Sequence, residues 1–275
     1  MLFISENDAI MGGKLFERGI MMNTNVLPKA VILDLDGTLL RSDKTVSERT
    51  LAVLEECKKK GMVIVVATAR FWFKAELFLN IIRPDYALLA DGTMIFHDGE
   101  LIHGFPMDNA TSENLIREIM NMEDGHDFVV GAGKVLLCAA KGVDEPWRQT
   151  YDFCAGFHKP AYKIASVMNS YEEAKKLADK FSCRLYSYRG EDLYAFTHKE
   201  SGKYQAVCAL GGLLNIDLQD MIAFGDDEND YEVLKYCGKG IAVANAIPMI
   251  KDIADDITDS NDNDGVVKYL EKYLR

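Results

Sequence analysis

Two aspartates stand two residues apart at the end of an apolar run, in the segment VILDLDGTLL at residues 31–40. Residues i and i+2 of an extended chain point to the same side, so the carboxylates of Asp34 and Asp36 can converge. Carboxylates that converge repel each other unless a cation lies between them. The pair therefore predicts a site that also holds a cation.

Polar residues follow other apolar runs as well: Thr68-Ala69-Arg70 after 62–67, GDDEND at 225–230 after 221–225, and Lys203 at the start of a helical pattern. Taken alone, an Asp-Gly pair can be only a turn, and GDDEND can be a solvated loop that caps a helix. In open α/β sheets, however, ligands bind beyond the carboxyl ends of the strands. Oxygen ligands from two strand ends suit Mg²⁺, whose coordination a phosphoryl group can complete.

The elements that must position these groups can be read from the pattern of apolar residues. Short apolar runs alternate with helical patterns, which predicts a parallel sheet covered by helices. The candidate strands are 30–35, 62–67, 86–90, 221–225 and 240–244. An amphipathic helix is expected at 47–60, where Ser47 can cap its start and Gly61 can end it.

The middle of the chain has a different pattern, in which paired strands have helices between them. The expected elements are a helix at 111–122, strands in HDFVVG and KVLLCAA, an aromatic helix near 144–157, a strand at 162–168, a helix that opens at Ser170 with Glu173 as a capping box, and strands in CRLYSY and LYAFTH. This pattern predicts an α+β module at 107–190, inserted in an α/β domain made of 29–106 and 191–275. Residues 1–28 are expected to form an N-terminal extension.

Composition and charge limit the possible classes of protein. The 275 residues are 48% hydrophobic and 27% charged, which is typical of a soluble globular protein with room for two domains. The net charge of −12 and the lack of a basic patch argue against nucleic acid. No apolar run reaches the roughly 18–20 residues of a membrane helix. Because the first residues lack a secretory signal and the cysteines lack paired spacing, we expect a cytoplasmic protein with reduced thiols.

Four segments in order resemble one known family, the haloacid dehalogenase superfamily. DLDGTL resembles its first motif, D-x-D-G-T-L, and VVATAR resembles its second, an apolar strand that ends in Thr or Ser. Lys203 resembles the lysine of the third motif, and GDDEND is similar to the fourth, G-D-x-x-N-D. The stretch 241–266 is similar to the end of Cof-like class IIB phosphatases. The resemblance covers 29–275 and implies a Rossmann-like core in which 107–190 is a type II cap.

The resemblance implies roles for three aspartates. Asp34 corresponds to the nucleophile, which attacks phosphorus and becomes an aspartyl phosphate. Asp36 corresponds to the general acid, which protonates the leaving oxygen and then activates water. The implied ligands of Mg²⁺ are the side chains of Asp34 and Asp226 and the backbone carbonyl of Asp36.

The resemblance also implies which residues surround the phosphoryl group. Thr68, the amide of Ala69 and Asn229 correspond to residues that donate hydrogen bonds to its oxygens. Lys203 corresponds to the residue that balances the charge of the nucleophile and the phosphoryl group. Asp230 corresponds to a residue that orients Lys203 or a metal-bound water.

Three features of the sequence leave alternatives open. Asp91-Gly92 stands where members of the family often have Asn-Gly, so it either adds negative charge to the site or only makes the turn. Arg70 can bind a second anionic group of the substrate or pair with a carboxylate. Phe71-Trp72-Phe73 can pack in the core, which is the preferred interpretation, or form a wall over the substrate.

Together with these residues, the resemblance implies a Mg²⁺-dependent phosphatase that hydrolyses small phosphorylated metabolites. Because class IIB members act on sugar phosphates and on cofactor phosphates, a sugar phosphate is favoured. A cap would exclude bulk water and choose the leaving group. Two alternatives remain at this point. One is a phosphomutase or phosphotransferase of the same superfamily, and the other is a regulator that binds a metabolite without turnover.

Overall fold

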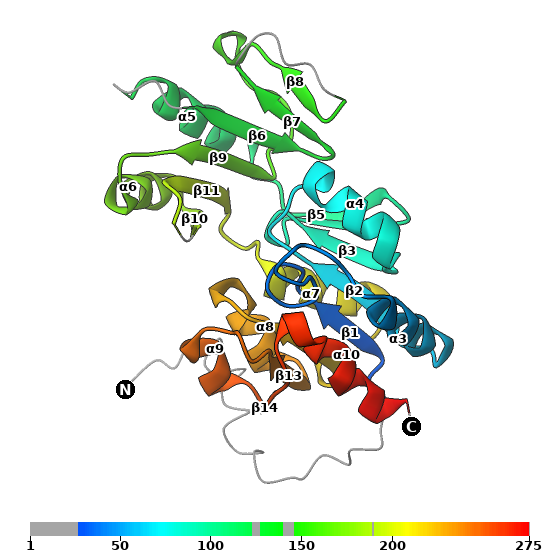
Figure 1. The fold of residues 1–275 in the computed structure, drawn as a ribbon. Coiled ribbons are helices and arrows are strands. Elements are labelled where there is room, and N and C mark those ends of the chain that lie inside the picture. Colours follow the sequence, from blue (N-terminus) through cyan, green and yellow to red (C-terminus); the bar gives the residue numbers. More distant parts are fainter. Residues whose placement is uncertain (1–26, 123–126, 140–145, 189, 275) are drawn as a thin grey trace, which may run out of the picture.

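The computed structural model describes residues 27–122, 127–139, 146–188 and 190–274. The predicted extension at 1–28 therefore lies outside the described residues, except for its last two. The described chain forms two sheets, one of eight strands and one of six. Figure 1 shows the six-stranded sheet with its helices at the top of the view and the eight-stranded sheet with its helices below.

The eight-stranded sheet has the order β14-β13-β12-β1-β2-β3-β4-β5. The pairs from β14 to β3 are parallel, and β3-β4 and β4-β5 are antiparallel. Because β12, β1 and β2 are parallel neighbours, the chain leaves all three strands at the same edge of the sheet. The strands are β1 (Ala30–Leu33), β2 (Val63–Ala67), β3 (Tyr86–Leu89), β4 (Met94–His97), β5 (Glu100–Gly104), β12 (Met221–Gly225), β13 (Lys239–Ala242) and β14 (Asp256–Ile257).

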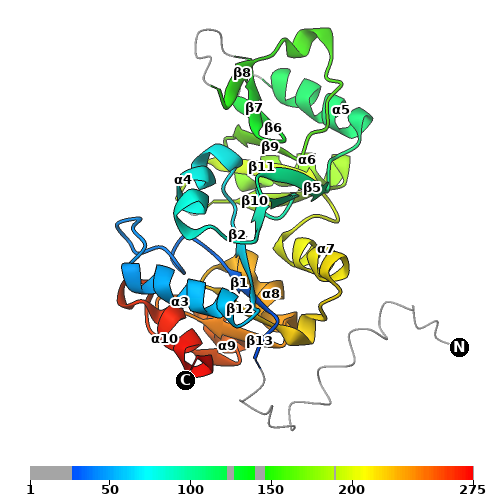
Figure 2. The same ribbon diagram turned by 90° about the vertical axis from the view of Figure 1, so that its right-hand side faces the viewer.

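Helices cover both faces of this sheet. The helices α3 (Glu48–Lys59) and α10 (Gly265–Leu270) contact each other on one side, and α7 (Lys203–Leu214) lies on the other side, as Figure 2 shows. Ser47 caps α3 by accepting a hydrogen bond from the Thr50 amide, as the sequence predicts. The remaining helices of this part are α4 (Trp72–Ile82), α8 (Tyr231–Tyr236) and α9 (Pro248–Ile253), with short 3₁₀ turns at 218–220, 228–230, 261–263 and 271–273.

The six-stranded sheet has the order β10-β11-β9-β6-β7-β8. Its strands are β6 (Phe128–Ala132), β7 (Val135–Cys138), β8 (Arg148–Thr150), β9 (Lys163–Val167), β10 (Cys183–Ser187) and β11 (Leu193–His198). The helices α5 (Asn109–Met120) and α6 (Tyr171–Phe181) bury Leu115, Ile119 and Leu177 against it in one apolar cluster. Ser170 caps α6 by accepting from the Glu173 amide. The predicted α/β fold, with a second module of helices on a largely antiparallel sheet, is confirmed.

Two predictions for the middle of the chain need correction. The aromatic helix expected near 144–157 is wrong, because the described part of that range holds β8 and a 3₁₀ turn at Phe153–Ala155. Its aromatic residues are spaced irregularly, and Phe153 and Phe157 pack into the apolar cluster of the six-stranded sheet. The boundary at 190 is also wrong, since β11 pairs with β10 and β9 of that sheet. A boundary at 190 would separate β10 from β11 and so break their pairing.

Candidate active site

Asp34 follows β1 directly and is buried beside the first residue of α7. The Nζ atom of Lys203 lies 2.6 Å from Asp34 Oδ1 and 2.6 Å from Asp230 Oδ1. All three residues are less than a tenth exposed. One buried ammonium group therefore serves two carboxylates, and the group keeps an excess of negative charge.

Burial and the neighbouring charges shift the protonation of this group. Burial raises the pKa of Asp34 well above its ordinary value, and the charge of Lys203 only partly opposes that effect. Burial alone would lower the pKa of Lys203, but the charges of Asp230 and Asp34 outweigh it and raise that pKa instead. Lys203 is therefore charged at neutral pH, whereas Asp34 needs a further cation to be stable as a carboxylate.

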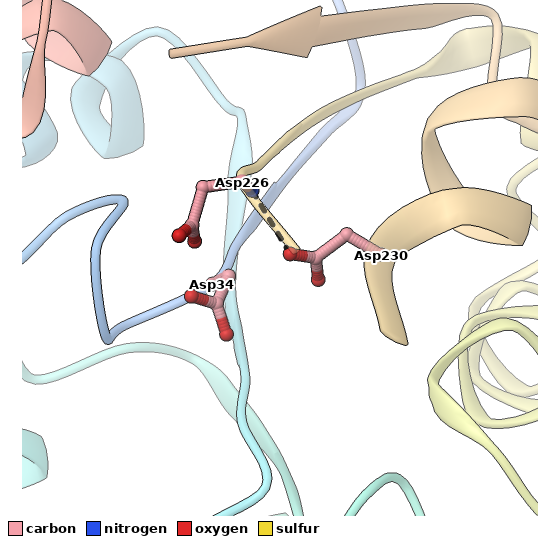
Figure 3. A group of neighbouring side chains, drawn as sticks. All are labelled: Asp34, Asp226 and Asp230. Carbon is pink, nitrogen blue, oxygen red and sulfur yellow. Dashed lines mark hydrogen bonds between the residues drawn. The ribbon is translucent and has the colours of Figure 1, made fainter. Parts of the chain in front are cut away.

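The carboxylates of Asp34, Asp226 and Asp230 are drawn in Figure 3, and an oxygen from each lies within 4.8 Å of the others. Asp226 follows β12, which pairs with β1, so the two strand ends place Asp34 and Asp226 side by side. Thr38 Oγ1 donates to Asp226 Oδ1 at 2.8 Å. Asp230 Oδ2 accepts from the Asp226 amide at 3.0 Å, the bond that Figure 3 marks with a dashed line.

The donor set of this cluster fits a divalent cation. Burial, aided by the charge of Asp230, raises the pKa of Asp226 to about 6. A cation between Asp34 and Asp226 would remove this penalty, and oxygen ligands are those that Mg²⁺ prefers.

Gly37 has a φ of +78°, and a Cβ there would overlap the Asp226 carboxylate. The glycine thus lets the chain after Asp34 pass close beside the cluster.

The side chain of Asp36 faces two cations instead of the acidic cluster. Arg70 Nε lies 2.6 Å from Asp36 Oδ2, Arg70 Nη2 lies 2.6 Å from Oδ1, and Lys44 Nζ lies 2.7 Å from Oδ1. Burial would raise the pKa of Asp36, but the hydrogen bonds from Arg70 and Lys44 outweigh it and lower the pKa to about 2. Of the two alternatives for Arg70, the structure supports pairing with a carboxylate.

A cavity of about 1080 Å³ brings together the residues singled out in the sequence. Every predicted site residue lines it except Asp230, which lies behind Lys203. Thr68 Oγ1 accepts from the Arg70 amide at 3.2 Å. The predicted residues that line the cavity are Asp34, Asp36, Thr68, Ala69, Lys203, Asp226 and Asn229.

The six-stranded sheet forms the opposite wall of this cavity. Arg184 and Tyr186 in β10 and Tyr188 just after it alternate along the chain and share one face, and Lys163 and Ala165 of β9 line the cavity too. None of these residues is predicted from the sequence. The alternation in CRLYSY is visible there, but only the pairing of β10 shows which face meets the site.

Asp91 and Lys163 form a buried ion pair across the two sheets. The Lys163 Nζ atom lies 2.6 Å from Asp91 Oδ2, and the side chains are 4% and 1% exposed. Tyr188 also donates to Asp91 Oδ2, at 2.9 Å, whereas Asp91 Oδ1 has no hydrogen-bond partner among the described residues. Asp91 has a φ of 60° and Gly92 a φ of 80°. Asp91-Gly92 therefore makes a turn, and the negative charge that Asp91 brings is neutralised by Lys163.

The aromatic run after the second motif lies at the junction of the two sheets. Phe73 stacks on Trp147 with ring centroids 4.1 Å apart, and Phe71 lines the cavity with Lys163 Nζ 4.9 Å from its ring centre. Trp72 packs on Phe96 of β4. The preferred interpretation of core packing holds for Phe71 and Trp72, which pack against a buried apolar cluster that includes Phe96, although Phe71 also lines the cavity. Phe73 stacks on Trp147 instead.

The comparison with protein families identifies the chain. A family model described as haloacid dehalogenase-like hydrolase matches residues 31–270. The chain belongs to this family. The family is the one that the four motifs indicate, and the prediction of a Cof-like phosphatase is confirmed.

Several similar proteins of known name support this assignment. The chain is 23% identical to the 5-amino-6-(5-phospho-D-ribitylamino)uracil phosphatase YitU of Bacillus subtilis, over 90% of this chain and 98% of that protein. It is 26% identical to phosphatase YwpJ of the same organism, over 90% of this chain and all of YwpJ. A haloacid dehalogenase-like hydrolase from Bacteroides thetaiotaomicron has the same fold, with a TM-score of 0.76 at 22% identity, over 89% of this chain and 99% of that one. Among the described residues, no helix has the length and apolar character needed to span a membrane.

Proposed function

We propose that this haloacid dehalogenase-like phosphatase uses Mg²⁺ and hydrolyses small phosphorylated metabolites through an aspartyl phosphate on Asp34. One observation carries the proposal: Asp34 lies beside Lys203 and Asp226 at the base of a single cavity. A carboxylate attacks an anionic phosphate poorly, because the two repel each other. The charge of Lys203 and of a bound Mg²⁺ at Asp34 and Asp226 would remove that repulsion.

The residues of the chain have separate parts in the proposed reaction. Thr68, the Ala69 amide and Asn229 hold the oxygens of the phosphoryl group. An Asp34 oxygen attacks phosphorus while the leaving oxygen takes a proton from Asp36. Water then attacks the aspartyl phosphate and gives its proton to Asp36, which releases phosphate and restores Asp34. Two easier displacements thus replace one difficult hydrolysis.

The ion pairs of Asp36 bear on its two tasks. The side chain is ionised while Arg70 and Lys44 hold it, which suits the step in which it takes a proton from water. To act as an acid it must first be protonated. A bound phosphoryl anion would attract both cations and weaken their hold on Asp36.

The six-stranded sheet, together with α5 and α6, serves as a cap in this proposal and limits the substrate to a small molecule. The cap side of the cavity carries rings and cations, among them Tyr171, Arg184 and Tyr186. Such a wall can contact the hydroxyls or the ring of a leaving group. YitU is named for a substrate that carries a phosphorylated ribityl chain. A sugar phosphate or a related polyol phosphate is therefore the class that we propose.

The test is the release of inorganic phosphate from a panel of phosphorylated sugars, polyols and nucleotides. We expect turnover with Mg²⁺, none after treatment with EDTA, and none from Asp34→Asn at either condition. The melting temperature of Asp34→Asn should not fall, because Lys203 keeps Asp230 as a partner. Normal Mg²⁺-dependent hydrolysis by Asp34→Asn would refute the proposal. A need for a bisphosphate activator would indicate a phosphomutase instead.

A further inference from the structure

We propose that Lys163, which belongs to the six-stranded sheet, is a positioning residue for the phosphate-binding loop. It would orient the Thr68 hydroxyl through the peptide group that joins Ala69 to Arg70. The inference rests on the proposed function, because it assigns Thr68 to the phosphoryl group. It adds a cap residue that is not among the residues proposed to hold the metal or the phosphoryl group.

The contacts form a short chain of hydrogen bonds. Lys163 Nζ donates to the Ala69 carbonyl at 3.2 Å, and the N–H at the other end of the same peptide, that of Arg70, donates to Thr68 Oγ1 at 3.2 Å. A cation on the carbonyl polarises the peptide and makes its N–H a stronger donor. A hydroxyl that accepts this bond directs its own proton elsewhere.

The Thr68 proton is available for the substrate. Thr68 is buried, lines the cavity, and in the described part of the chain its hydroxyl proton has no protein acceptor. Because the Arg70 amide occupies one lone pair of the hydroxyl oxygen, fewer orientations remain for the O–H bond. The hydroxyl is therefore prepared to donate to a phosphoryl oxygen, which lowers the cost of ordering it on binding.

Lys163 is fixed firmly enough to act in this way. Its side chain is 4% exposed and bonded to Asp91, and its Nζ atom lies 4.9 Å from the ring centre of Phe71 and 5.0 Å from that of Tyr188. A Cβ on Gly131 would overlap the Phe71 ring, so that glycine lets the ring lie close to the six-stranded sheet. Rings on two sides and a carboxylate at its end leave the ammonium little freedom.

The shape of the loop does not depend on Lys163. The Ala90 amide donates to the Arg70 carbonyl at 2.8 Å, and the Asp91 amide donates to the Thr68 carbonyl at 3.2 Å. These bonds come from the eight-stranded sheet and hold the loop from its other side. Lys163 therefore orients only the peptide that joins Ala69 to Arg70. It can do so only while the two sheets are packed together as observed.

The first experiment separates this role from simple stabilisation. Lys163→Met leaves the buried Asp91 carboxylate without its cation, so we expect a lower melting temperature and a kcat lowered about 10-fold. Asp91→Asn combined with Lys163→Met should recover the melting temperature but not kcat, because the Ala69 carbonyl still lacks its donor. Recovery of both would show a merely structural role and overturn the inference. Lys134→Met is the control, since Lys134 contacts Trp72 across the junction but not the loop.

The second experiment tests whether Lys163 acts through Thr68. Thr68→Val removes the hydroxyl, so adding Lys163→Met to it should lower kcat by less than about two-fold. The inhibition constant for inorganic phosphate should rise in each single variant and no further in the double variant. Additive losses would overturn the inference. Asp34→Asn is assayed in parallel. An active Asp34→Asn would refute the proposed function. An inactive Asp34→Asn together with a fully active Lys163→Met would refute only the role of Lys163.

Discussion

The two sheets of this protein line the same cavity with different kinds of side chain. The buried cluster of the eight-stranded sheet holds more carboxylates than cations, since Asp34 and Asp230 share Lys203, and Asp226 accepts from the Thr38 hydroxyl with no ion pair among the described residues. The six-stranded sheet contributes rings and two cations that each have a carboxylate partner, Lys163 with Asp91 and Arg184 with Glu232. The first region therefore carries uncompensated negative charge, whereas the positive charges of the second region are paired with carboxylates.

The difference in charge balance suggests that the two regions have separate functions, one in the reaction and one in the choice of substrate. In the proposed reaction, a cation would compensate this unbalanced cluster of carboxylates and so let it bind an anionic phosphoryl group at the reacting centre. A balanced wall of rings gains little from a cation and instead favours leaving groups that fit it. Changes in the first region should therefore affect turnover of every substrate, and changes in the second should affect substrates unequally.

The largest effect should come from removing the cation of the eight-stranded sheet. Lys203→Met leaves two buried carboxylates without a partner, which costs about 3–5 kcal/mol of unfolding free energy. It also removes charge balance at the nucleophile, so kcat/KM should fall by about 10²-fold or more on all substrates. Urea denaturation and phosphate release measure the two effects. The exposed Lys199→Met serves as the control, and a stable, active Lys203→Met would remove the distinction between the two sheets.

The next effect concerns the metal. Asp226→Asn removes one proposed ligand, so the Mg²⁺ concentration for half-maximal activity should rise at least about 10-fold. Activity at saturating Mg²⁺ should recover in part, because Asp34 is intact. Titration of activity with Mg²⁺ checks this, with the exposed Asp252→Asn as the matched control. An unchanged Mg²⁺ requirement would place the metal away from Asp226.

A smaller and selective effect is expected in the six-stranded sheet. Tyr186→Ala removes a ring from the cavity wall, so kcat/KM for a hexose phosphate should fall about 10-fold. Acetyl phosphate has almost no leaving group to contact the wall, so its hydrolysis should change by less than about two-fold. The ratio of the two rates is the measurement. Equal losses on both substrates would mean that this wall serves the chemistry and not the selection of substrate.

The smallest effect is a dependence of stability on pH in the metal-free protein. The pKa of Asp226 is about 6 in the folded state, against an ordinary value of 3.8, so the folded state binds more protons between these values. Its contribution to stability is complete below about pH 4 and is lost as the pH rises through 6. Unfolding in EDTA should therefore need roughly 1 kcal/mol less at pH 7 than at pH 5. Asp226→Asn should reduce this difference, and an unchanged difference would trace it to other groups.

The sequence predicts best those features that depend on local order along the chain. The strand at 221–225 is found as β12 with the same bounds, and the other four predicted strands lie within two residues of their predicted ends, whereas the short edge strand β14 was not predicted. An apolar run with polar residues after it suffices for such a prediction, because the carboxyl ends of parallel strands meet at one edge. This is also why Asp34, Thr68 and Asp226 could be expected near one another.

Predictions failed where the outcome depends on contacts between distant segments. The aromatic segment near 144–157 contains residues that suit either a helix or a packed strand, and pairing of β8 with β7 decided between them. Lys163 offers no signal at all in the sequence, since a lysine in a strand is normally exposed. Only the approach of Asp91, 72 residues away along the chain, makes its burial acceptable.

The order of residues along the chain by itself determined the family, the α/β class and the acidic groups at the strand ends, because these depend on spacing within short segments. Tertiary structure alone decided that Arg70 holds Asp36, that Lys163 neutralises Asp91, and that Tyr186 faces the cavity. Each of these depends on which face of a strand meets another sheet. The pairing of strands far apart in sequence fixes that face, and no short segment contains this information.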